Sequence, residues 1–505
     1  MSNEARPAAG AAESSSKGLR ANTLGVFGSS IIGLASTAPL YSLAATLGYV
    51  VLAVGAQAPL VFLLAAIPMV FAAFAYQELN RAMPDCGTTF VWGTKAFGPR
   101  TGWIGGWALA VASVMVLANV SEISATYFWR LVGNTEFAES KPVVIATAVV
   151  FIVLMTIVSV IGVQLGERLQ AVLMTFQMLV LLGFGVAAGV AAVSGSNPDS
   201  TAFSWDWFNP AQLPSWTAFM QAVLLALFIY WGWDTCLALN EETRNPRKTP
   251  GRAALVTIAV LIVTYVGVTI TVMMFAGFGD SGTGLTNPDT LDDVFTAMKD
   301  VLFGPWGWLL ILAVMASAAS STQTTILPTA RGTLSMAVYR ALPAKFAAVH
   351  PRFQTPWFST VVMGIAAIGY YVIMSIVSAD MLADSLSSMG LAVALYYAIT
   401  SFAAFWYFRH TLRDSARNLW FRGIFPLLGG LMLAYAFVQS AIDMLSVDYG
   451  YTVLLGVGGS FVIGVGVILI GFVLMAAWGM RPGAKPFFRG ESLNADTPIL
   501  VPDEG

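Results

Sequence analysis

Charged residues and cysteines are scarce in this sequence. Only 10% of its 505 residues are charged, whereas 57% are hydrophobic, and the mean hydropathy is +0.74. Because ordinary soluble domains carry about 25% charged residues, this composition excludes a soluble protein. The two cysteines, Cys86 and Cys236, are too few for a disulfide framework or a metal cluster. The composition predicts a polytopic membrane protein without a metal site.

Histidine is almost absent. His350 and His410 are the only two, which excludes the metal-binding HExxH motif and His-based catalytic triads. The sequence also lacks a Walker A pattern, and its apolar runs contain no nucleophile, histidine or metal constellation of an intramembrane enzyme. We therefore expect no enzymatic activity, no cofactor and no nucleic-acid partner.

Long apolar runs are what the sequence does contain, and twelve of them can cross a hydrocarbon core about 30 Å thick as helices. They cover residues 22–51, 56–80, 102–131, 142–163, 169–193, 216–242, 252–278, 305–336, 357–378, 382–408, 423–445 and 451–478. The first twenty residues are rich in Ala, Ser and Gly and lack the apolar stretch of a signal peptide. The predicted divisions are a disordered tail (1–21), a ten-helix transport core (22–408), two further spans (409–480) and a C-terminal tail (481–505).

Lysine and arginine are confined to alternate loops of this arrangement. All but three of the 25 basic residues fall on the side of the N-terminus, the exceptions being Arg130, Lys141 and Lys299. Because short loops rich in Lys and Arg stay in the cytoplasm, the pattern predicts a multi-pass protein of the cytoplasmic (inner) membrane with both termini in the cytoplasm.

Two of the apolar runs are interrupted. Tyr230-Trp231-Gly232-Trp233-Asp234 breaks the sixth run, and Gly33-Leu34-Ala35-Ser36-Thr37-Ala38-Pro39 breaks the first. Unpaired backbone in hydrocarbon costs several kcal/mol, so such a break persists only where it lines a cavity. Paired breaks in spans 1 and 6 indicate an inverted five-plus-five repeat with a substrate site between them. An ordinary kink at Pro39 is the alternative for the first break.

The same segments resemble a known family. Tyr230-Trp231-Gly232-Trp233-Asp234, followed by Glu241-Glu242 and Asn245-Pro246, is similar to the sixth-span signature of the amino acid, polyamine and organocation (APC) transporters. Pro84-Asp85-Cys86-Gly87-Thr88-Thr89-Phe90 and Gly105-Gly106-Trp107 resemble their second-to-third-span loop. The likeness covers about residues 22–480 and departs at Gly33-Leu34-Ala35-Ser36, where the family often has a Gly-x-Gly turn. It implies an all-α, leucine-transporter-like fold and secondary active transport of amino acids or related organic amines by alternating access.

The resemblance implies that the substrate lies between the two breaks. Half-helix N-termini expose N–H groups that suit a carboxylate, and half-helix C-termini expose carbonyls that suit an ammonium. We therefore expect the carboxylate to face the backbone of Ser36, Thr37 and Ala38. The amine should face the carbonyls of Ile32, Ile229 and Tyr230, and Trp231, Gly232 and Trp233 complete the predicted site. Either tryptophan could instead serve for packing, and Asp234 is interpreted as the N-cap of the second half of span 6.

Span 3 offers two further polar candidates, Asn119 and Glu122, which are three residues apart and so share a helical face. A carboxylate inside a span is costly and usually serves a cavity or a partner. Glu122 as a counter-charge would favour the alternative function, a cationic amino acid or polyamine carrier or exchanger. Glu241 and Glu242, beside Arg244, Arg247 and Lys248, are interpreted as an ion-pair gate at the inner end or as a solvated helix end.

The coupling ion is left between H⁺ and Na⁺. Sodium would need carbonyls near Ile31 and Ile32 to converge with the hydroxyls of Ser320, Ser321 and Thr322, although those hydroxyls could equally serve helix packing. Some members of the family place a lysine in span 5, where this chain has Gln177. We favour protons carried by Glu122. A channel or receptor, a different class, is disfavoured because two broken helices in one chain are typical of a self-contained carrier.

Overall fold

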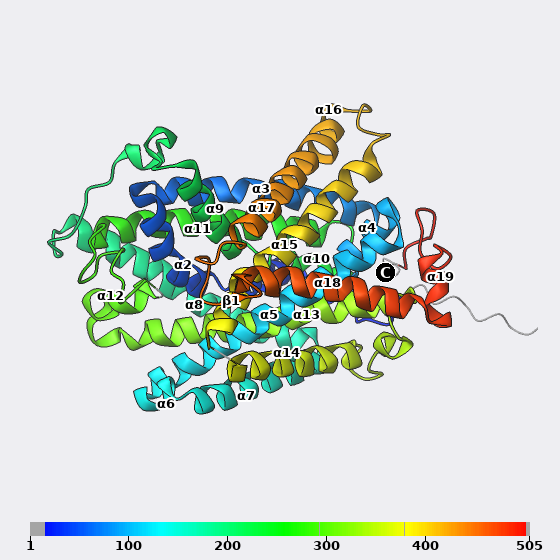
Figure 1. Ribbon diagram of the computed structural model, residues 1–505, viewed down its shortest axis with the longest axis horizontal. Helices are drawn as coiled ribbons and strands as arrows, with labels where there is room; N and C mark the ends of the chain where they lie inside the picture. Colours follow the sequence, from blue (N-terminus) through cyan, green and yellow to red (C-terminus); the bar gives the residue numbers. More distant parts are fainter. Residues whose placement is uncertain (1–15, 292, 378, 501–505) are drawn as a thin grey trace, which may run out of the picture.

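The computed structural model describes residues 16–291, 293–377 and 379–500 of the chain, and almost all regular structure in them is helical. Most long helices run along the long axis of the molecule (Figure 1). The long elements are α1 (Val26–Thr37), α2 (Pro39–Val54), α3 (Ala58–Ala82), α5 (Pro99–Val132), α7 (Lys141–Ile161), α8 (Val163–Val193), α9 (Trp216–Ile229), α11 (Thr249–Ala276), α13 (Trp308–Val338), α14 (Trp357–Val377), α15 (Ala379–Phe408), α17 (Phe425–Asp443) and α18 (Gly459–Gly479).

Shorter elements connect them. They are α4 (Thr89–Phe97), α6 (Thr135–Glu139), α10 (Thr235–Ala238), α12 (Val294–Phe303), α16 (Ala416–Asn418), α19 (Lys485–Phe488) and the small hairpin β1 (Val453–Leu454) with β2 (Val457–Gly458). Ten helical runs in the described chain are long and apolar enough to span a membrane. One of them, Val26–Ala82, contains both of the first two predicted spans, and the predicted sixth span is the shorter apolar helix Trp216–Ile229 followed by irregular backbone. The count of twelve is therefore not confirmed, while the polytopic helical fold is.

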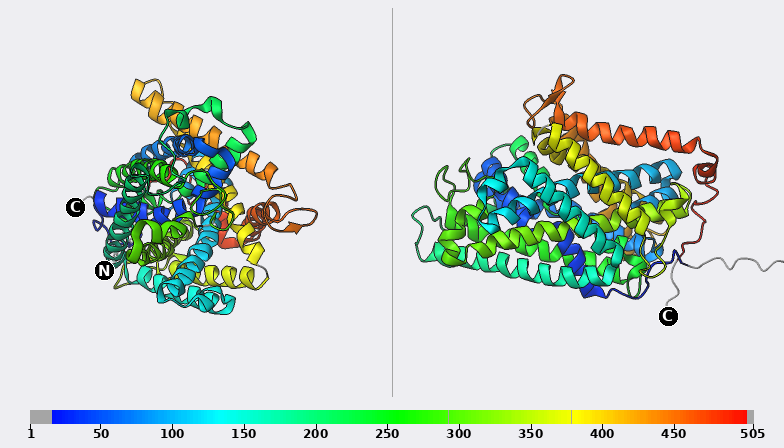
Figure 2. Two further views of the ribbon diagram at one scale, coloured as in Figure 1. Left: turned by 90° about the vertical axis from the view of Figure 1, so that its left-hand side faces the viewer. Right: turned by 90° about the horizontal axis from the view of Figure 1, so that it is seen from below.

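The helices pair as an inverted repeat requires. α3 packs against α11, α5 against α13, and α7 against α14, so spans 2, 3 and 4 each meet the equivalent span of the second half. α17 packs on α3 and α15, while α18 lies across α5 and α15 at the edge of the bundle (Figures 1 and 2). The side chains at the centre are mostly apolar and combine many alanines with large aromatic and aliphatic residues.

Both predicted breaks are present, and the first occupies only the end of its predicted segment. α1 continues through Gly33 and Ser36 and ends at Thr37; Ala38 alone is left-handed, with φ of 45°, and Pro39 begins α2. Proline is suited to the first turn of a helix because its missing N–H needs no partner there. In the sixth span, α9 ends at Ile229, residues 230–234 form turns, and α10 resumes for only four residues.

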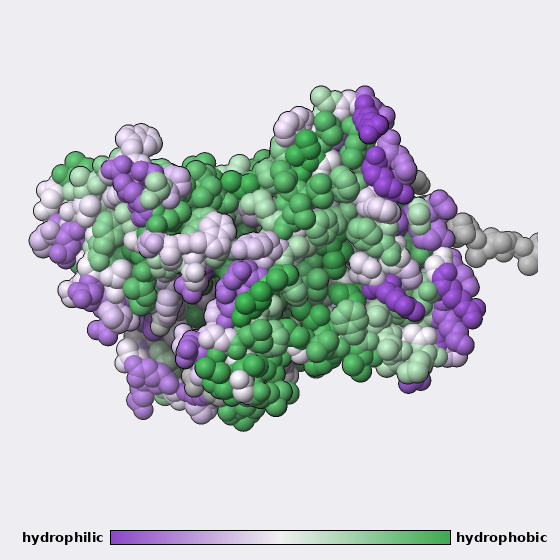
Figure 3. Space-filling model, turned by 45° about the horizontal axis from the view of Figure 1, so that its top comes forward, coloured by the Kyte–Doolittle hydropathy of each residue, from purple (hydrophilic) through white to green (hydrophobic). Residues whose placement is uncertain are grey.

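One end of the bundle carries most of the basic residues, and we call it the basic end. It comprises residues 16–24, 83–98, 240–248, 339–356, 409–424 and 480–500, and its hydrophilic surface forms the right-hand end of Figure 3, beyond a broad apolar belt. Glu78, at the end of α3, is surrounded there by Arg81, Arg417 and Arg422 at 2.5 to 2.7 Å.

The two chain ends were expected to be tails, and the structure corrects part of this. Residues 1–15 and 501–505 lie outside the described residues. Lys17 and Leu19 are buried, so the expected disorder is wrong for residues 16–21. At the other end Phe487 packs on Phe90, and the ammonium of Lys95 donates to carbonyls at 495 and 497.

Candidate functional site

The two breaks face each other across the centre of the bundle. The hydroxyls of Ser36 and Thr235 are 3.0 Å apart, which joins the end of α1 to the start of α10. A Cβ on Gly232 would lie 2.9 Å from the carbonyl oxygen of Ser36, and Gly232 itself has a φ of +111°. Close backbone approach and positive φ therefore both require glycine at this position. The hydroxyl of Ser321, on α13, donates to the same Ser36 carbonyl at 3.1 Å.

The backbone groups available at the breaks differ from those expected. Ser36 and Thr37 lie inside α1, so their N–H groups belong to its helical ladder, and the Ala38 N–H donates to Ala35 at 3.3 Å. The donors at the half-helix N-terminus are those of Leu40 and Tyr41, in the first turn of α2, and carboxylate binding by residues 36–38 stays a prediction.

The expected carbonyls are also partly engaged. Ile32 is buried in the interior of α1, where its carbonyl belongs to the helix. The Ile229 carbonyl accepts from the Tyr265 hydroxyl at 2.9 Å. The hydroxyl of Tyr230 donates to the Phe62 carbonyl at 3.0 Å, which anchors the start of the break against α3. A role of these residues in substrate binding stays a prediction.

Polar side chains from two neighbouring helices complete the surroundings of the first break. The hydroxyl of Tyr41 donates to the Asn119 side-chain oxygen at 3.0 Å. The backbone N–H of Tyr41 donates to the Ser317 hydroxyl at 3.4 Å. Asn119 thus lies beside the first break, and its role in substrate binding stays a prediction. Tyr41 and Ser317 were not among the predicted site residues; their signal would have been their position on the broken span and at the start of the hydroxyl run of span 8.

Asp234 does not cap α10. Its carboxylate instead accepts the hydroxyls of Tyr397 at 2.9 Å and Tyr396 at 3.1 Å, both on α15, and no side-chain bond to the helix start is formed. The side chain is buried and has no ion-pair partner in the described part of the chain. The capping interpretation was therefore wrong, and a buried carboxylate held by two neutral hydroxyls lies directly at the break.

The two tryptophans flanking Gly232 point into this same cluster. The indole N–H of Trp231 donates to the hydroxyl of Tyr396. Trp233 stacks on Tyr397 with ring centroids 5.3 Å apart, and its buried indole N–H has no acceptor among the described residues. Both tryptophan side chains are thus packed against protein, and Trp231 donates to Tyr396, one of the two tyrosines that donate to Asp234.

The three hydroxyls considered for sodium do not converge on a common point. Ser320 donates to the side-chain oxygen of Gln170, Ser321 to Ser36, and Thr322 to the Ala318 carbonyl inside its own helix. The Gln170 amide in turn donates to the Ser320 carbonyl at 3.1 Å and to Gln323 at 2.6 Å. Gln170, rather than Gln177, is therefore the span 5 residue that lies against the hydroxyl run.

Glu122 lies apart from this group. It is only partly buried, and the charged and titratable groups that face it are Lys141 at the start of α7 and Tyr371 on α14. Asn119 faces α2 instead, so the two residues expected to act together have different neighbours. Its assignment as proton carrier stays a prediction.

A cluster of buried charged residues lies at the basic end, where the broken span 6 ends. The ammonium of Lys17 lies 2.7 Å from Asp85 and 2.6 Å from Glu241, and the N–H of Cys86 donates to the same Glu241 oxygen at 2.9 Å. All of these side chains are buried. A carboxylate oxygen of Asp85, the sulfur of Cys86 and a carboxylate oxygen of Glu241 lie within 4.8 Å of one another, and the Lys17 ammonium lies among them. We call these four residues the Lys17 cluster.

Charge complementarity decides the ionisation of this cluster. Burial by itself would lower the pKa of the Lys17 ammonium, but the adjacent carboxylates, Asp85 first, outweigh burial and hold this pKa well above its usual value. Burial likewise opposes ionisation of Asp85, yet the Lys17 ammonium holds the Asp85 pKa below its usual value. Burial, reinforced by the Glu241 charge, raises the pKa of the Cys86 thiol well above its usual value.

Glu242 makes a second buried ion pair at this end. The Arg331 guanidinium, on α13, donates to its two carboxylate oxygens at 2.9 and 3.1 Å. Of the two interpretations of Glu241 and Glu242, the structure supports ion pairs over a solvated helix end, but with partners other than the expected ones. Arg331 and Lys17 replace Arg244, Arg247 and Lys248, because the pairs connect segments far apart in the sequence.

Comparison with known proteins supports one family. The amino acid permease model matches residues 22–480. A protein of Mycobacterium tuberculosis described as an uncharacterized transporter is 25% identical over 91% of this chain and 91% of its own length. The methylthioribose transporter of Bacillus subtilis is 27% identical over 71% of this chain and 76% of its own. A branched-chain amino acid permease of Lactococcus lactis is 25% identical over 41% and 46%, respectively.

Proposed function

Because the chain belongs to the amino acid permease family, we propose that it is a secondary active transporter of amino acids or related organic amines that works by alternating access. The observation that carries this proposal is the contact between two helix breaks, where Gly232 meets Ser36 and Thr235 meets Ser36. Half-helix ends that meet inside an apolar bundle supply backbone donors and acceptors for a zwitterion without charged side chains. By the positive-inside rule we assign the basic end to the cytoplasm and the protein to the cytoplasmic membrane.

The arrangement also supports a closed cytoplasmic side. The Lys17 cluster and the Arg331 pair join the N-terminal segment, the 83–88 loop, α13 and the end of span 6. Opening toward the cytoplasm must separate these groups. A substrate or ion can drive that step only by its different affinity for the two states. We propose that the ten-helix core (22–408) performs this motion while spans 11 and 12 support it.

We further propose that transport is coupled to protons and that Asp234 carries the proton. An unpaired carboxylate in apolar surroundings is costly, and a proton neutralises it. Asp234 belongs to the break itself and accepts hydrogen bonds from Tyr396 and Tyr397 on α15. Its charge can therefore bias the position of the break relative to α15. Glu122 lies beside α7 and α14 and is the second candidate.

Uptake by the purified protein in proteoliposomes tests the proposal. The substrate panel includes all amino acids, polyamines and, because of the Bacillus relative, methylthioribose. We expect accumulation of at least one amino acid under an imposed inward proton gradient with sodium absent from both sides. Accumulation that needs sodium and ignores the pH step would overturn proton coupling, whereas no transport of any amine or amino acid would overturn the substrate class.

The same carboxylate favours one alternative, a carrier of cationic amino acids or polyamines. A substrate ammonium could neutralise Asp234 in place of a proton. Arginine, lysine and polyamines would then be bound tightly by wild type and weakly by Asp234→Asn, while small neutral amino acids would be unaffected. Equal affinities of Asp234→Asn and wild type for the cations would exclude this alternative.

A further inference from the structure

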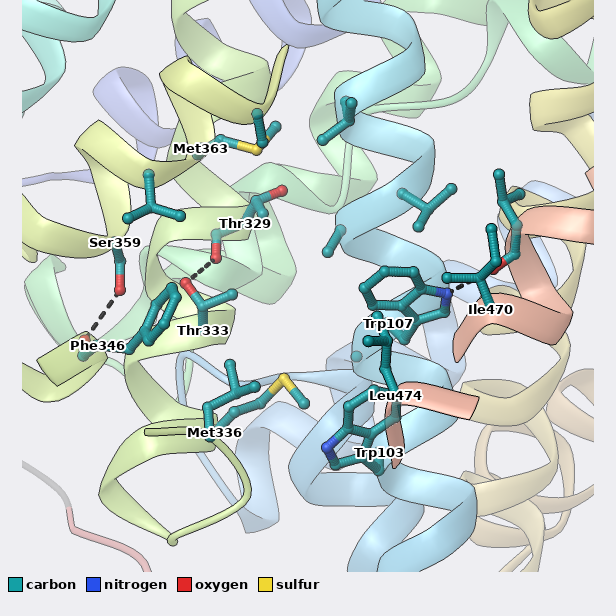
Figure 4. A pocket seen from close by; sticks show the side chains of 18 of the residues that line it. Trp103, Trp107, Thr329, Thr333, Met336, Phe346, Ser359, Met363, Ile470 and Leu474 are labelled. Carbon is teal, nitrogen blue, oxygen red and sulfur yellow. Dashed lines mark hydrogen bonds between the residues drawn. The ribbon is translucent and has the colours of Figure 1, made fainter. Parts of the chain in front are cut away.

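A groove opens between four helices at the edge of the bundle, away from the helix breaks. Its walls come from the first half of α5, the end of α13, the start of α14 and the end of α18 (Figure 4). Trp103 and Trp107 on α5, Met336 on α13 and Leu474 on α18 point into the same space. The cavity volume is about 570 Å³, which lies within the roughly 300 to 1,000 Å³ of small-molecule sites.

The dimensions of the groove match one bilayer leaflet. Its lining follows α5 from Trp103 to Met115 and α18 from Val467 to Trp478. At 1.5 Å per residue this corresponds to about 18 Å, slightly more than half of a hydrocarbon core about 30 Å thick. Both segments lie in the half of the bundle nearest the basic end, because α5 begins there and α18 ends there. The groove therefore has the length of a single acyl chain.

The walls of the groove are apolar because most of their polar side chains donate hydrogen bonds to backbone carbonyls. The indoles of Trp103 and Trp107 donate to the carbonyls of Ala341 and Val467 at 3.0 and 2.8 Å. The Thr333 hydroxyl donates to a carbonyl in its own helix at 2.8 Å. Polar side chains are thus turned toward backbone, which leaves hydrocarbon facing the space.

Two polar atoms lining the groove are exceptions. The indole N–H of Trp478 and the hydroxyl of Thr329 are buried and have no hydrogen-bond partner among the described residues. Thr329 is only 4% exposed. Both atoms are enclosed by protein, so the surface that the groove presents to a ligand is still hydrocarbon.

The mouth of the groove at the basic end is cationic. The segments that border it, residues 99–103, 340–346 and 478–485, contain no acidic residue. Their basic residues are exposed and form no ion pair within the described part of the chain; they are Arg100, Arg340, Lys345, Arg481 and Lys485. Each Lys or Arg near a membrane surface attracts anionic lipid by about 1 kcal/mol.

We propose that the groove is a binding site for one anionic phospholipid of the leaflet at the basic end. One acyl chain lies between α5, α13, α14 and α18. The phosphate group lies at the mouth among Arg340, Lys345 and Arg481. The site joins α18 to the core helices, so an occupied groove stabilises the attachment of span 12.

Native mass spectrometry of the purified, delipidated protein tests the site. Phosphatidylglycerol and phosphatidylcholine with identical chains are added in parallel, and we expect one phosphatidylglycerol to be retained at least about tenfold more tightly. Arg340→Gln with Arg481→Gln should remove this preference. The matched control is Arg252→Gln with Arg413→Gln, two exposed arginines outside the segments that border the groove, which should keep it.

Filling the groove tests the acyl chain separately. Ala110→Phe and Ala366→Phe place a ring in the space, and both positions are solvent- or lipid-accessible, so folding is not at risk. Both variants should lose the retained lipid and the rise in unfolding temperature that it gives wild type. Val172→Phe, on a lipid-facing position of α8 that is 69% exposed, is the control. Equal retention of phosphatidylcholine, or retention unchanged by groove filling, would overturn the proposal.

Discussion

At the scale of single residues, Gly232 is the most constrained position of the candidate site. Its φ of +111° and the 2.9 Å approach of a Cβ to the Ser36 carbonyl leave no room even for a methyl group. Strain of about 1 to 3 kcal/mol accompanies such a backbone conformation in other residues, before any clash is counted.

We therefore predict that Gly232→Ala, and not only Gly232→Leu, lowers amino acid uptake by at least about tenfold, because strain of this size and the clash both displace the break. Uptake is measured in proteoliposomes at equal protein content. Gly183→Ala is the control, since that glycine lies on exposed α8 with nothing near its Cβ position. Normal uptake by Gly232→Ala would show that the breaks need not keep this contact during transport.

Asp234 and Glu122 give a second prediction at this scale. Asp234→Asn keeps the size of the side chain but removes its charge. We expect it to abolish accumulation driven by a proton gradient while substrate exchange across the membrane continues, because exchange needs no net proton movement. Glu122→Gln should keep gradient-driven accumulation. The reverse result would assign the proton to Glu122, as the sequence suggested.

At the scale of elements, the contact between α8 and α13, which we call the seam, determines which oxygen atoms are available to a sodium ion. Gln170 presents its amide N–H group to the Ser320 carbonyl, the kind of oxygen that a sodium ion would need. We predict that replacing sodium with choline leaves uptake unchanged within about twofold, since the hydroxyls of Ser320, Ser321 and Thr322 are each hydrogen-bonded to protein groups and do not converge. A strict sodium requirement in wild type would contradict this reading of the seam.

The N-terminal segment gives the next prediction, and Cys86 serves as its reporter. Cys86 lies 3.7 Å from the Lys17 ammonium and is buried, so a maleimide reaches it only when the basic end opens. Removing one partner of a buried pair costs about 3 to 5 kcal/mol, so Lys17→Gln should raise labelling of Cys86 by more than about tenfold. Cys236→Ala removes the second thiol, and the exposed Arg20 supplies the control Arg20→Gln. Unchanged labelling in Lys17→Gln would mean that the segment does not hold this end closed.

The helical fold was largely predictable from the sequence, but the tertiary contacts between its helices were not. Apolar runs revealed the spans, and Gly232 between two tryptophans revealed the second break, because both signals are local. The first break occupies only the end of its predicted segment, since small residues such as Gly33 and Ser36 remain helical when neighbouring helices pack closely.

The partners of buried charges could not be read from the sequence. Lys17 and Glu241 are separated by 224 residues, and Asp234 and Tyr396 by 162. Local patterns favoured a cap for Asp234 and nearby arginines for Glu241. The tertiary structure overrides both because a buried carboxylate takes whichever donors the packed helices bring to it.

At the scale of the whole molecule, the centre and the basic end should respond differently to pH. The Asp85 pKa is lowered, so its contribution to closure is complete above the usual value of about 3.9 and is lost only as the pH falls through a still lower value. The Lys17 pKa is raised, so its contribution is complete below about 10.4 and is lost only as the pH rises past a higher value. The Lys17–Asp85 pair therefore keeps its charges across the range in which the protein works, whereas burial raises the pKa of Glu241 above its usual value.

We assign a pH effect on opening between pH 6 and 8 to Asp234 at the break, with Glu241 of the Lys17 cluster as the alternative. In the Cys236→Ala background with a saturating amino acid substrate, Cys86 protection is the ratio of labelling rates in unfolded and native protein at each pH, which cancels the titration of the thiol. We predict that this protection changes with pH in wild type, by at most about tenfold per unit because one proton is involved. It should stay constant in Asp234→Asn. A pH dependence that survives in Asp234→Asn would place the proton on another group, and Glu122→Gln in the same assay would then show whether Glu122 carries it.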